Sequence, residues 1–232
     1  MDIKPVTFGD EGQVATRELL RRMDALAPFR LAGHRTLHGQ MSTLESIDRQ
    51  YGGSAPLALE DADELCAAIH TQLAHWDAEA SRRQLEAHEH VAALAIGVAL
   101  WAIRHEVEIT VPEPVANALA WRSNHCATRQ ELAAVFGLMQ GVIAHLAPRL
   151  SPDLERSNPE RPWRVLHVNL AITAIRTEDP ALMDFAFDAL DRALPDERAG
   201  FYGEALALAL APGIAPEVRE RIEARHVHWT PR

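Results

Sequence analysis

The sequence predicts an all-α fold: a single domain of eight or nine mostly antiparallel helices, arranged as helical hairpins around one fully apolar central helix. Apolar residues recur at helical spacing along most of the chain, and helix-start signals and short connections separate these segments. The strand-like alternation of residues 107–111 has no second strand to pair with and ends at Pro112. We therefore expect an extended connector there rather than a sheet.

The most informative stretch is residues 91–103, thirteen consecutive apolar positions in a helix predicted to run from about 82 to 106. A transmembrane helix needs about 20 apolar residues, so we expect this run at the centre of a helical protein rather than in a bilayer. Its large side chains should be almost fully buried, and the clearest examples are Leu94, Val98 and Trp101.

Small residues line one face of this central helix: Ala92, Ala95, Ala99 and Ala102. The helix also contains Gly97, and glycine in a helix interior costs about 1 kcal/mol relative to alanine. We expect a close contact with another helix to offset that cost. The functional alternative is that this face meets a ligand or another subunit.

The remaining helices follow from periodicity and from their first residues. Thr128 and Glu131 form a capping-box pattern, and Asp179 before Pro180 is typical of an N-cap. The other predicted segments are 11–27, 35–49, 60–79, 114–125, 128–147, 161–176, 179–194, 196–211 and a last helix from about 215 to 225. Connections of two to five residues make neighbouring helices antiparallel. The segment at 60–79 could also continue into the central helix.

For domain organisation, we expect N-terminal helices and a connector in residues 1–56 and the main helical-hairpin body in residues 57–232, together as one continuous domain. The spacing of Ala186, Leu190 and Ala193 is similar to the second helix of a tetratricopeptide unit. The helix before it lacks the glycine and tyrosine pattern of that family, so we expect hairpins outside any repeat family.

The charge of the chain argues against several classes of partner. The net charge is −10, and residues 61–110 alone carry three arginines against nine carboxylates, a balance of −6. Nucleic acids and anionic membranes require clustered Lys or Arg, so neither is an expected partner.

We expect no signal peptide and no membrane span, and the cytoplasm is the expected location. The two cysteines, Cys66 and Cys126, are expected to be small buried residues.

Histidines in the acidic segment raise the question of a metal site: His70, His75, His88, His90 and His105. If the chain turns near Ser81, His75 comes near His88, and Glu86 and His90 lie four residues apart on one helical face. Imidazole and carboxylate together can bind Zn²⁺ or Fe²⁺, so the candidate metal ligands are His75, Glu86 and His90. No Glu-x-x-His or His-Glu-x-x-His signature accompanies them. We favour a solvated, charged helix start at this point and expect no cofactor.

Patterns of nucleophilic catalysis and phosphate binding are missing from the sequence. There is no Gly-x-Ser-x-Gly or Ser-x-x-Lys motif, and there is no Walker or Gly-x-Gly-x-x-Gly loop. Asn124, His125 and Cys126 are adjacent, but adjacent residues on a helix do not face each other. No catalytic residue is therefore predicted.

The expected function is a non-catalytic interaction module or scaffold whose partner is another protein, with a homodimer as one form of that association. Two alternatives stay open. One is a metal-dependent or small-molecule-binding enzyme or sensor that uses helix-borne His and Glu in residues 70–105. The other is a bundle that holds an apolar ligand beside the alanine-rich face.

At the C-terminus, Trp229 is expected to dock onto the body of the protein. A partner-binding tail or a metal pair of His226 and His228 are the alternatives there.

Overall fold

The computed structural model describes residues 12–51, 60–211 and 214–230, and these ranges contain ten α-helices, one short 3-10 helix and no strand. The α-helices are α1 (Gly12–Leu26), α2 (His34–Tyr51), α3 (Glu60–Arg83), α4 (His88–Arg104), α5 (Glu113–Asn124), α6 (Arg129–Leu150), α7 (Pro162–Thr177), α8 (Pro180–Ala193), α9 (Arg198–Ala209) and α10 (Pro216–Trp229). The all-α prediction is confirmed. The expected count of eight or nine is wrong, since these ranges hold ten α-helices. Helices α3 and α4 are separate and do not form one continuous helix: Gln84, directly after α3, has a left-handed φ of 54°.

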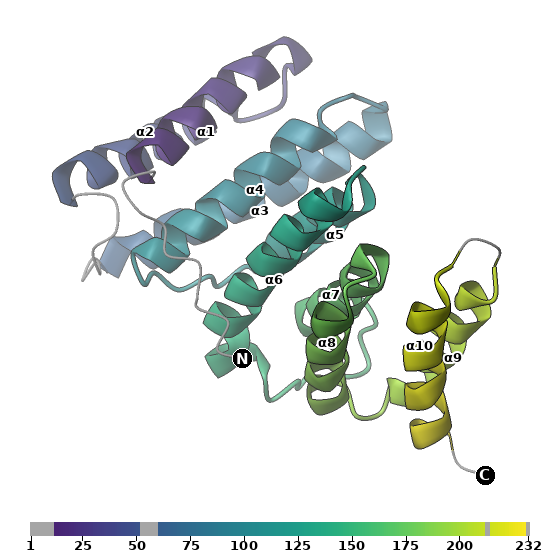
Figure 1. Cartoon of the computed structure of the whole chain (residues 1–232). Coiled ribbons are helices and arrows are strands. Elements are labelled where there is room, and N and C mark those ends of the chain that lie inside the picture. The colour runs from purple at the N-terminus through teal and green to yellow at the C-terminus, as the bar shows by residue number, and fades with distance from the viewer. Residues whose placement is uncertain (1–11, 52–59, 212–213, 231–232) are drawn as a thin grey trace. The chain divides into compact units, whose positions relative to one another are not determined.

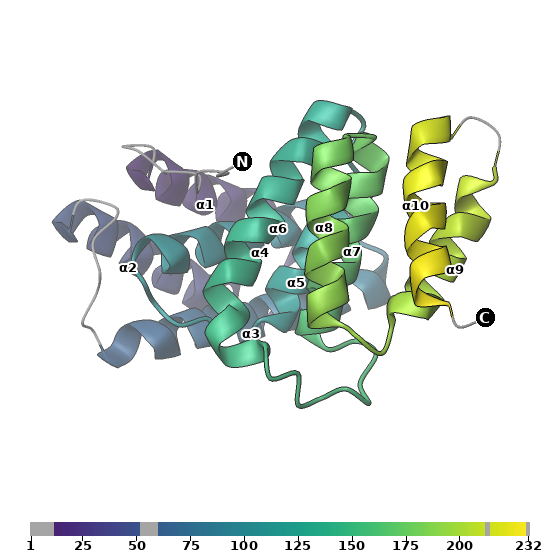
Figure 2. The ribbon, with the colours of Figure 1, turned by 60° about the horizontal axis from the view of Figure 1, so that its bottom comes forward.

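The chain divides into two compact units. The first holds the described residues up to Arg122 together with Ala144–Pro148, and the second holds Ser123–Ile143 and the described residues from Arg149 onward. In the first unit α1 packs against α2 and α4, and α3 packs against α4. In the second, α7 lies beside α8 and α9 beside α10, as both views show (Figures 1 and 2). The boundary expected at residues 56 and 57 lies outside the described residues.

Helix α4 lies in the core of the first unit, as its uninterrupted apolar run predicts. Leu94, Val98 and Trp101 are fully buried. Gly97 faces Leu19 of α1, and a Cβ atom added to this glycine would lie 2.3 Å from Leu19 Cδ2. The close helix contact expected at Gly97 is therefore present, and α1 is the helix that makes it.

A buried polar network joins α1, α2 and the C-terminal end of α4. Asp48 is 1% exposed, and its carboxylate accepts hydrogen bonds from His105 Nε2 at 2.6 Å, Thr16 Oγ1 at 3.0 Å and Arg104 Nη2 at 3.3 Å. A buried carboxylate is costly unless its oxygens are hydrogen-bonded. Here both oxygens have partners, so the network is satisfied and fixes the position of α2.

The predicted helix starts of the second unit are confirmed. Thr128 Oγ1 accepts from the Glu131 amide at 3.2 Å, and the Glu131 carboxylate accepts from the Thr128 amide at 3.2 Å, which completes the capping box. Asp179 Oδ1 accepts from the Ala181 amide at 2.8 Å at the start of α8. The last helix is longer than expected: α10 continues beyond Arg225 to Trp229.

Helix α6 is the one helix in the described ranges that is long and apolar enough to cross a membrane by length and composition. The expectation of no membrane span stays a prediction, since length and composition alone do not place a helix in a bilayer. A third of its most apolar window is buried inside the protein, and the core helix of a soluble protein meets the same criteria. Leu132, Phe136 and Met139 form part of its buried face.

Candidate functional site

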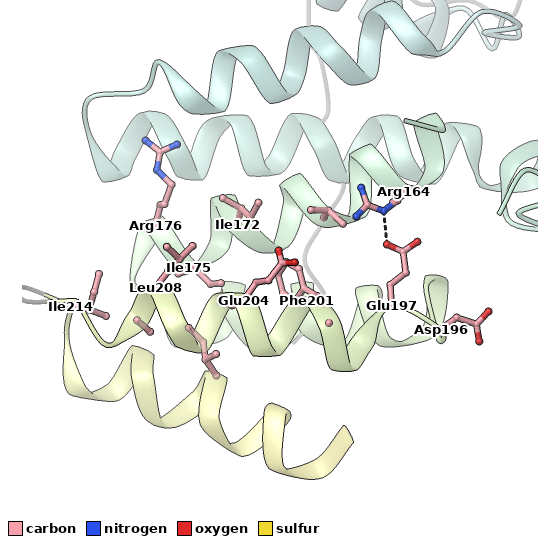
Figure 3. Close-up of a pocket in the computed structure, with 15 residues that line it drawn as sticks. Arg164, Ile172, Ile175, Arg176, Asp196, Glu197, Phe201, Glu204, Leu208 and Ile214 are labelled. Carbon is pink, nitrogen blue, oxygen red and sulfur yellow. Dashed lines mark hydrogen bonds and ion pairs between the residues drawn. The ribbon is translucent and has the colours of Figure 1, made fainter. Parts of the chain in front are cut away.

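An apolar groove of about 500 Å³ lies between α7 and α9 in the second unit (Figure 3). Its α7 wall includes Arg164, Val168, Ile172 and Ile175, which are spaced by four, four and three residues, and the neighbouring Arg176 also lines the groove. Its α9 wall includes Phe201, Glu204, Ala205 and Leu208, spaced by three, one and three residues. These spacings place each set on one face of its helix. The groove is thus formed by two helix faces that lie opposite each other.

Several large apolar side chains of this groove are open to solvent. Leu208 is 75% exposed, Ile172 is 37% exposed and Ile214 is 36% exposed. Figure 3 shows Ile172 and Ile175 directed from α7 toward Glu204 and Phe201 on α9. Exposed apolar groups gathered in one concave surface are typical of a binding site, whereas single exposed groups are ordinary.

Polar contacts on the other side of α9 and α10 attach this helix pair to α8. Asp184, Asp188 and Asp191 lie along one face of α8. Arg221 Nη1 donates to Asp184 at 2.7 Å, and Arg225 donates to Asp188 and Asp191 at 2.6 Å each. The α10–α8 side is therefore closed by ion pairs, while the α9–α7 side remains an apolar groove.

Asp191 is the central residue of this attachment. It is 6% exposed and accepts hydrogen bonds from Tyr202 Oη at 2.9 Å, Arg225 Nη1 at 2.6 Å and Trp229 Nε1 at 3.1 Å. Burial raises the pKa of Tyr202, and the negative charge of Asp191 raises it further, so this hydroxyl stays protonated and donates. The prediction that Trp229 docks onto the protein is confirmed.

The charged side chains of the groove differ in their hydrogen-bond and ion-pair partners. Arg164 pairs with Glu197, and Asp196 accepts from Arg156 Nη1 at 3.2 Å. Arg176 Nη1 donates to the Ser123 carbonyl at 2.6 Å. Glu204, in the middle of the α9 wall, has no hydrogen-bond or ion-pair partner among the residues that the structure describes.

A second cavity, of about 470 Å³, lies in the first unit and is lined by residues of α3, α4 and α5. Two residues of the alanine stripe, Ala92 and Ala95, form part of it. At its edge His88 Nδ1 donates to Asp77 Oδ1 at 2.8 Å. The small-residue face of α4 therefore borders an open space, in addition to the helix contact made by Gly97.

The structure does not assemble the candidate metal ligands. His75 and Glu86 are exposed and His90 is half-buried, and no group of three or more His, Cys, Asp or Glu in the described parts of the chain is placed to hold a metal ion. The physical reason lies in the turn, which falls at residues 84–87 instead of near Ser81. His88 consequently meets Asp77 and not His75.

The structure also places the two cysteines, the buried His70 and the C-terminal histidines that the sequence singled out. Cys66 and Cys126 are free and buried, as expected. Burial lowers the pKa of His70 to about 4, so this imidazole is neutral in the core. His226 lies within 3.3 Å of the Thr230 hydroxyl, and His228 is exposed.

No family model, curated protein or solved structure matches this chain, so the site is defined by its own residues. Sequence reasoning did not single out the groove. Val168, Ile172 and Leu208 have the helical spacing of ordinary core positions. That spacing shows which residues share a face, but it does not show whether another helix covers the face.

Proposed function

We propose that this chain is a non-catalytic interaction module, built of helical hairpins, that binds an amphipathic helix of another protein in the α7–α9 groove. One observation carries the proposal: two opposed helix faces present apolar residues at helical spacing, and the space between them is open. Burying such faces is the usual source of affinity when a helix binds in a groove.

The dimensions of the groove support a helix as the occupant. Its wall residues extend along α9, which has 12 residues. At 1.5 Å per residue this corresponds to a length of about 18 Å, or roughly three turns of a partner helix. A helix of that length presents an apolar stripe at positions i, i+3, i+4 and i+7, which suits two parallel rows of apolar side chains.

The charges support a basic partner helix. Glu204 lies among apolar residues of the α9 wall, and docking would remove water from its carboxylate. A Lys or Arg next to the apolar stripe of the partner would compensate this carboxylate, whereas an acidic residue there would be repelled. The net charge of −10 also favours the approach of a basic segment.

The proposal is tested by selecting helical peptides of about 14 residues, randomised on one face, against the immobilised full chain. The expected binders share an apolar i, i+3, i+4, i+7 stripe with a neighbouring Lys or Arg. Leu208→Asp should weaken their binding by about tenfold or more, because it places a charge on the apolar wall. Glu204→Gln should weaken it by about threefold.

The matched control is Leu154→Asp, since Leu154 is 90% exposed in the connection before α7 and does not line the groove. Circular dichroism checks that both variants keep their helices. Binders that tolerate Leu208→Asp, or binders whose common charge is acidic, contradict the proposal. A wild-type dimer in analytical ultracentrifugation that Leu208→Asp converts to monomer would assign the groove to a second copy and likewise contradict it.

A further inference from the structure

The cavity of the first unit has an apolar floor built from small side chains. Its buried lining residues are Leu73, Val91, Ala92, Ala95 and Ala118. Three of these five residues are alanines, and they come from α4 and α5. Alanine side chains leave room that leucine would fill, and a volume of about 470 Å³ lies within the range of small-molecule sites.

The mouth of this cavity is polar and acidic. Asp77 and Glu113 contribute carboxylates, and Asn117 contributes an amide. His88 lies at the same edge, with its side chain 31% exposed, and its Nδ1–H holds Asp77 through the 2.8 Å hydrogen bond. Within the described part of the chain, no Lys or Arg lines this cavity, and Trp121 supplies an aromatic wall.

We infer that this cavity binds a small organic amine, with its ammonium group at the mouth beside Glu113 and Asp77 and its apolar body on the alanine floor. The two carboxylates stabilise a cation and repel an anion. The indole of Trp121 can attract the cation through its ring face or pack against an aromatic body. The surrounding segment, residues 61–110, which includes Asp77, carries a net charge of −6 and likewise favours a positively charged ligand.

This inference does not depend on the α7–α9 groove, because all lining residues of the cavity belong to the first unit. It also assigns a role to the alanine stripe of α4. Gly97 faces α1, whereas Ala92 and Ala95 face the cavity. Helix α4 therefore makes a close helix contact at Gly97 and borders the cavity with Ala92 and Ala95 of the stripe.

The test uses three probes that share a phenyl ring and differ in charge: 2-phenylethylamine, 2-phenylethanol and 3-phenylpropanoate. Each is titrated into the full chain while the indole NH signal of Trp121, assigned with Trp121→Phe, is followed by NMR. The amine should bind with a dissociation constant of about 1 mM or lower. The alcohol should bind about threefold more weakly, and the carboxylate should bind most weakly.

Variants locate the site and separate the contribution of the carboxylate charge to binding from that of the cavity volume. Ala78→Leu, at a cavity-lining position of α3, should weaken binding of the amine and the alcohol by about tenfold. The matched control is Ala68→Leu, which is exposed on the same helix, does not line the cavity and should leave both affinities unchanged. Glu113→Gln should lower the amine affinity by about threefold and leave the alcohol affinity as it is.

Three results would overturn the inference. One is the absence of binding for every probe at about 10 mM. Another is a carboxylate probe that binds as tightly as the amine. The last is amine binding that survives Ala78→Leu, since the probe would then occupy another part of the protein.

Discussion

The indole Nε1 of Trp229, near the end of α10, donates a hydrogen bond to Oδ2 of Asp191 on α8 at 3.1 Å. The guanidinium of Arg198, on α9, lies 4.1 Å from the centre of the same indole ring. A single tryptophan thus joins three helices of the second unit. The contact also explains why α10 continues past Arg225, because the added turn brings the indole to a buried carboxylate.

Replacing Asp191 should destabilise the second unit strongly. Asp191→Ala removes the buried carboxylate that accepts from Tyr202, Arg225 and Trp229. Arg225 then keeps only its bond to Asp188, and Tyr202 keeps only a long contact of 3.4 Å to the Phe187 carbonyl. We expect a loss of about 3–5 kcal/mol in the free energy of unfolding, measured by urea denaturation. Asp184→Ala is the control: its ion pair with Arg221 is largely exposed and should contribute about 1 kcal/mol or less. Equal losses for the two variants would contradict this account.

The contact between Gly97 and Leu19 predicts a graded response to side-chain size. Gly97→Ala places Cβ against Leu19 Cδ2 and should destabilise, although alanine is the better helix former. Gly97→Leu should be worse, with a loss of about 3 kcal/mol or more in the free energy of unfolding.

The control for this prediction is Gly39→Ala on α2. Apart from its own helix backbone, no atom of the described residues lies within 4 Å of the added Cβ, so this substitution should stabilise the protein by about 1 kcal/mol. In a double-mutant cycle, Leu19→Ala should relieve part of the cost of Gly97→Ala. Additive losses would show that the two residues do not interact.

Buried histidines predict that stability falls in mild acid. Burial lowers the pKa of both His70 and His167 to about 4. The pKa of an unfolded histidine is about 6.5, so between pH 6.5 and 4 the unfolded chain binds more protons than the folded chain. The stabilising contribution is therefore complete above about pH 6.5 and is lost as the pH falls toward 4.

Each of these histidines should contribute on the order of 3 kcal/mol to this loss. Neither ring nitrogen of His167 has a hydrogen-bond partner among the described residues, so His167→Met should fold and should show a shallower decline. Urea denaturation at a series of pH values measures the slope. His75→Gln, at an exposed position, is the control. A decline that His167→Met leaves unchanged would contradict the assignment.

Metal content is the simplest check on the hypothesis that His75, Glu86 and His90 bind a metal ion. His75 and Glu86 are exposed, and the structure does not place them with His90 as a ligand group. A site needs three or four ligands at about 2.0–2.2 Å. Protein purified without an affinity tag or chelator should therefore carry well under one equivalent of Zn, Fe or Mn by elemental analysis. Stoichiometric metal that is lost in His75→Ala would reverse this conclusion.

The sequence by itself determined the features that depend on neighbouring residues. The capping box of Thr128 and Glu131 and the N-cap at Asp179 involve residues two or three positions apart, so their hydrogen bonds could be predicted. The burial of Leu94 and Trp101 followed for a similar reason, since a helix that is apolar on every side has no face for solvent.

Only the tertiary structure decided which faces are covered and which side chains meet. A turn a few residues later than expected paired His88 with Asp77, because a small shift changes which residues lie opposite in two adjacent helices. Ile172 and Leu208 have the spacing of core residues, yet they line an open groove. Helical spacing encodes the direction of a side chain relative to its own helix, whereas the neighbour that it meets depends on packing between segments far apart in the chain.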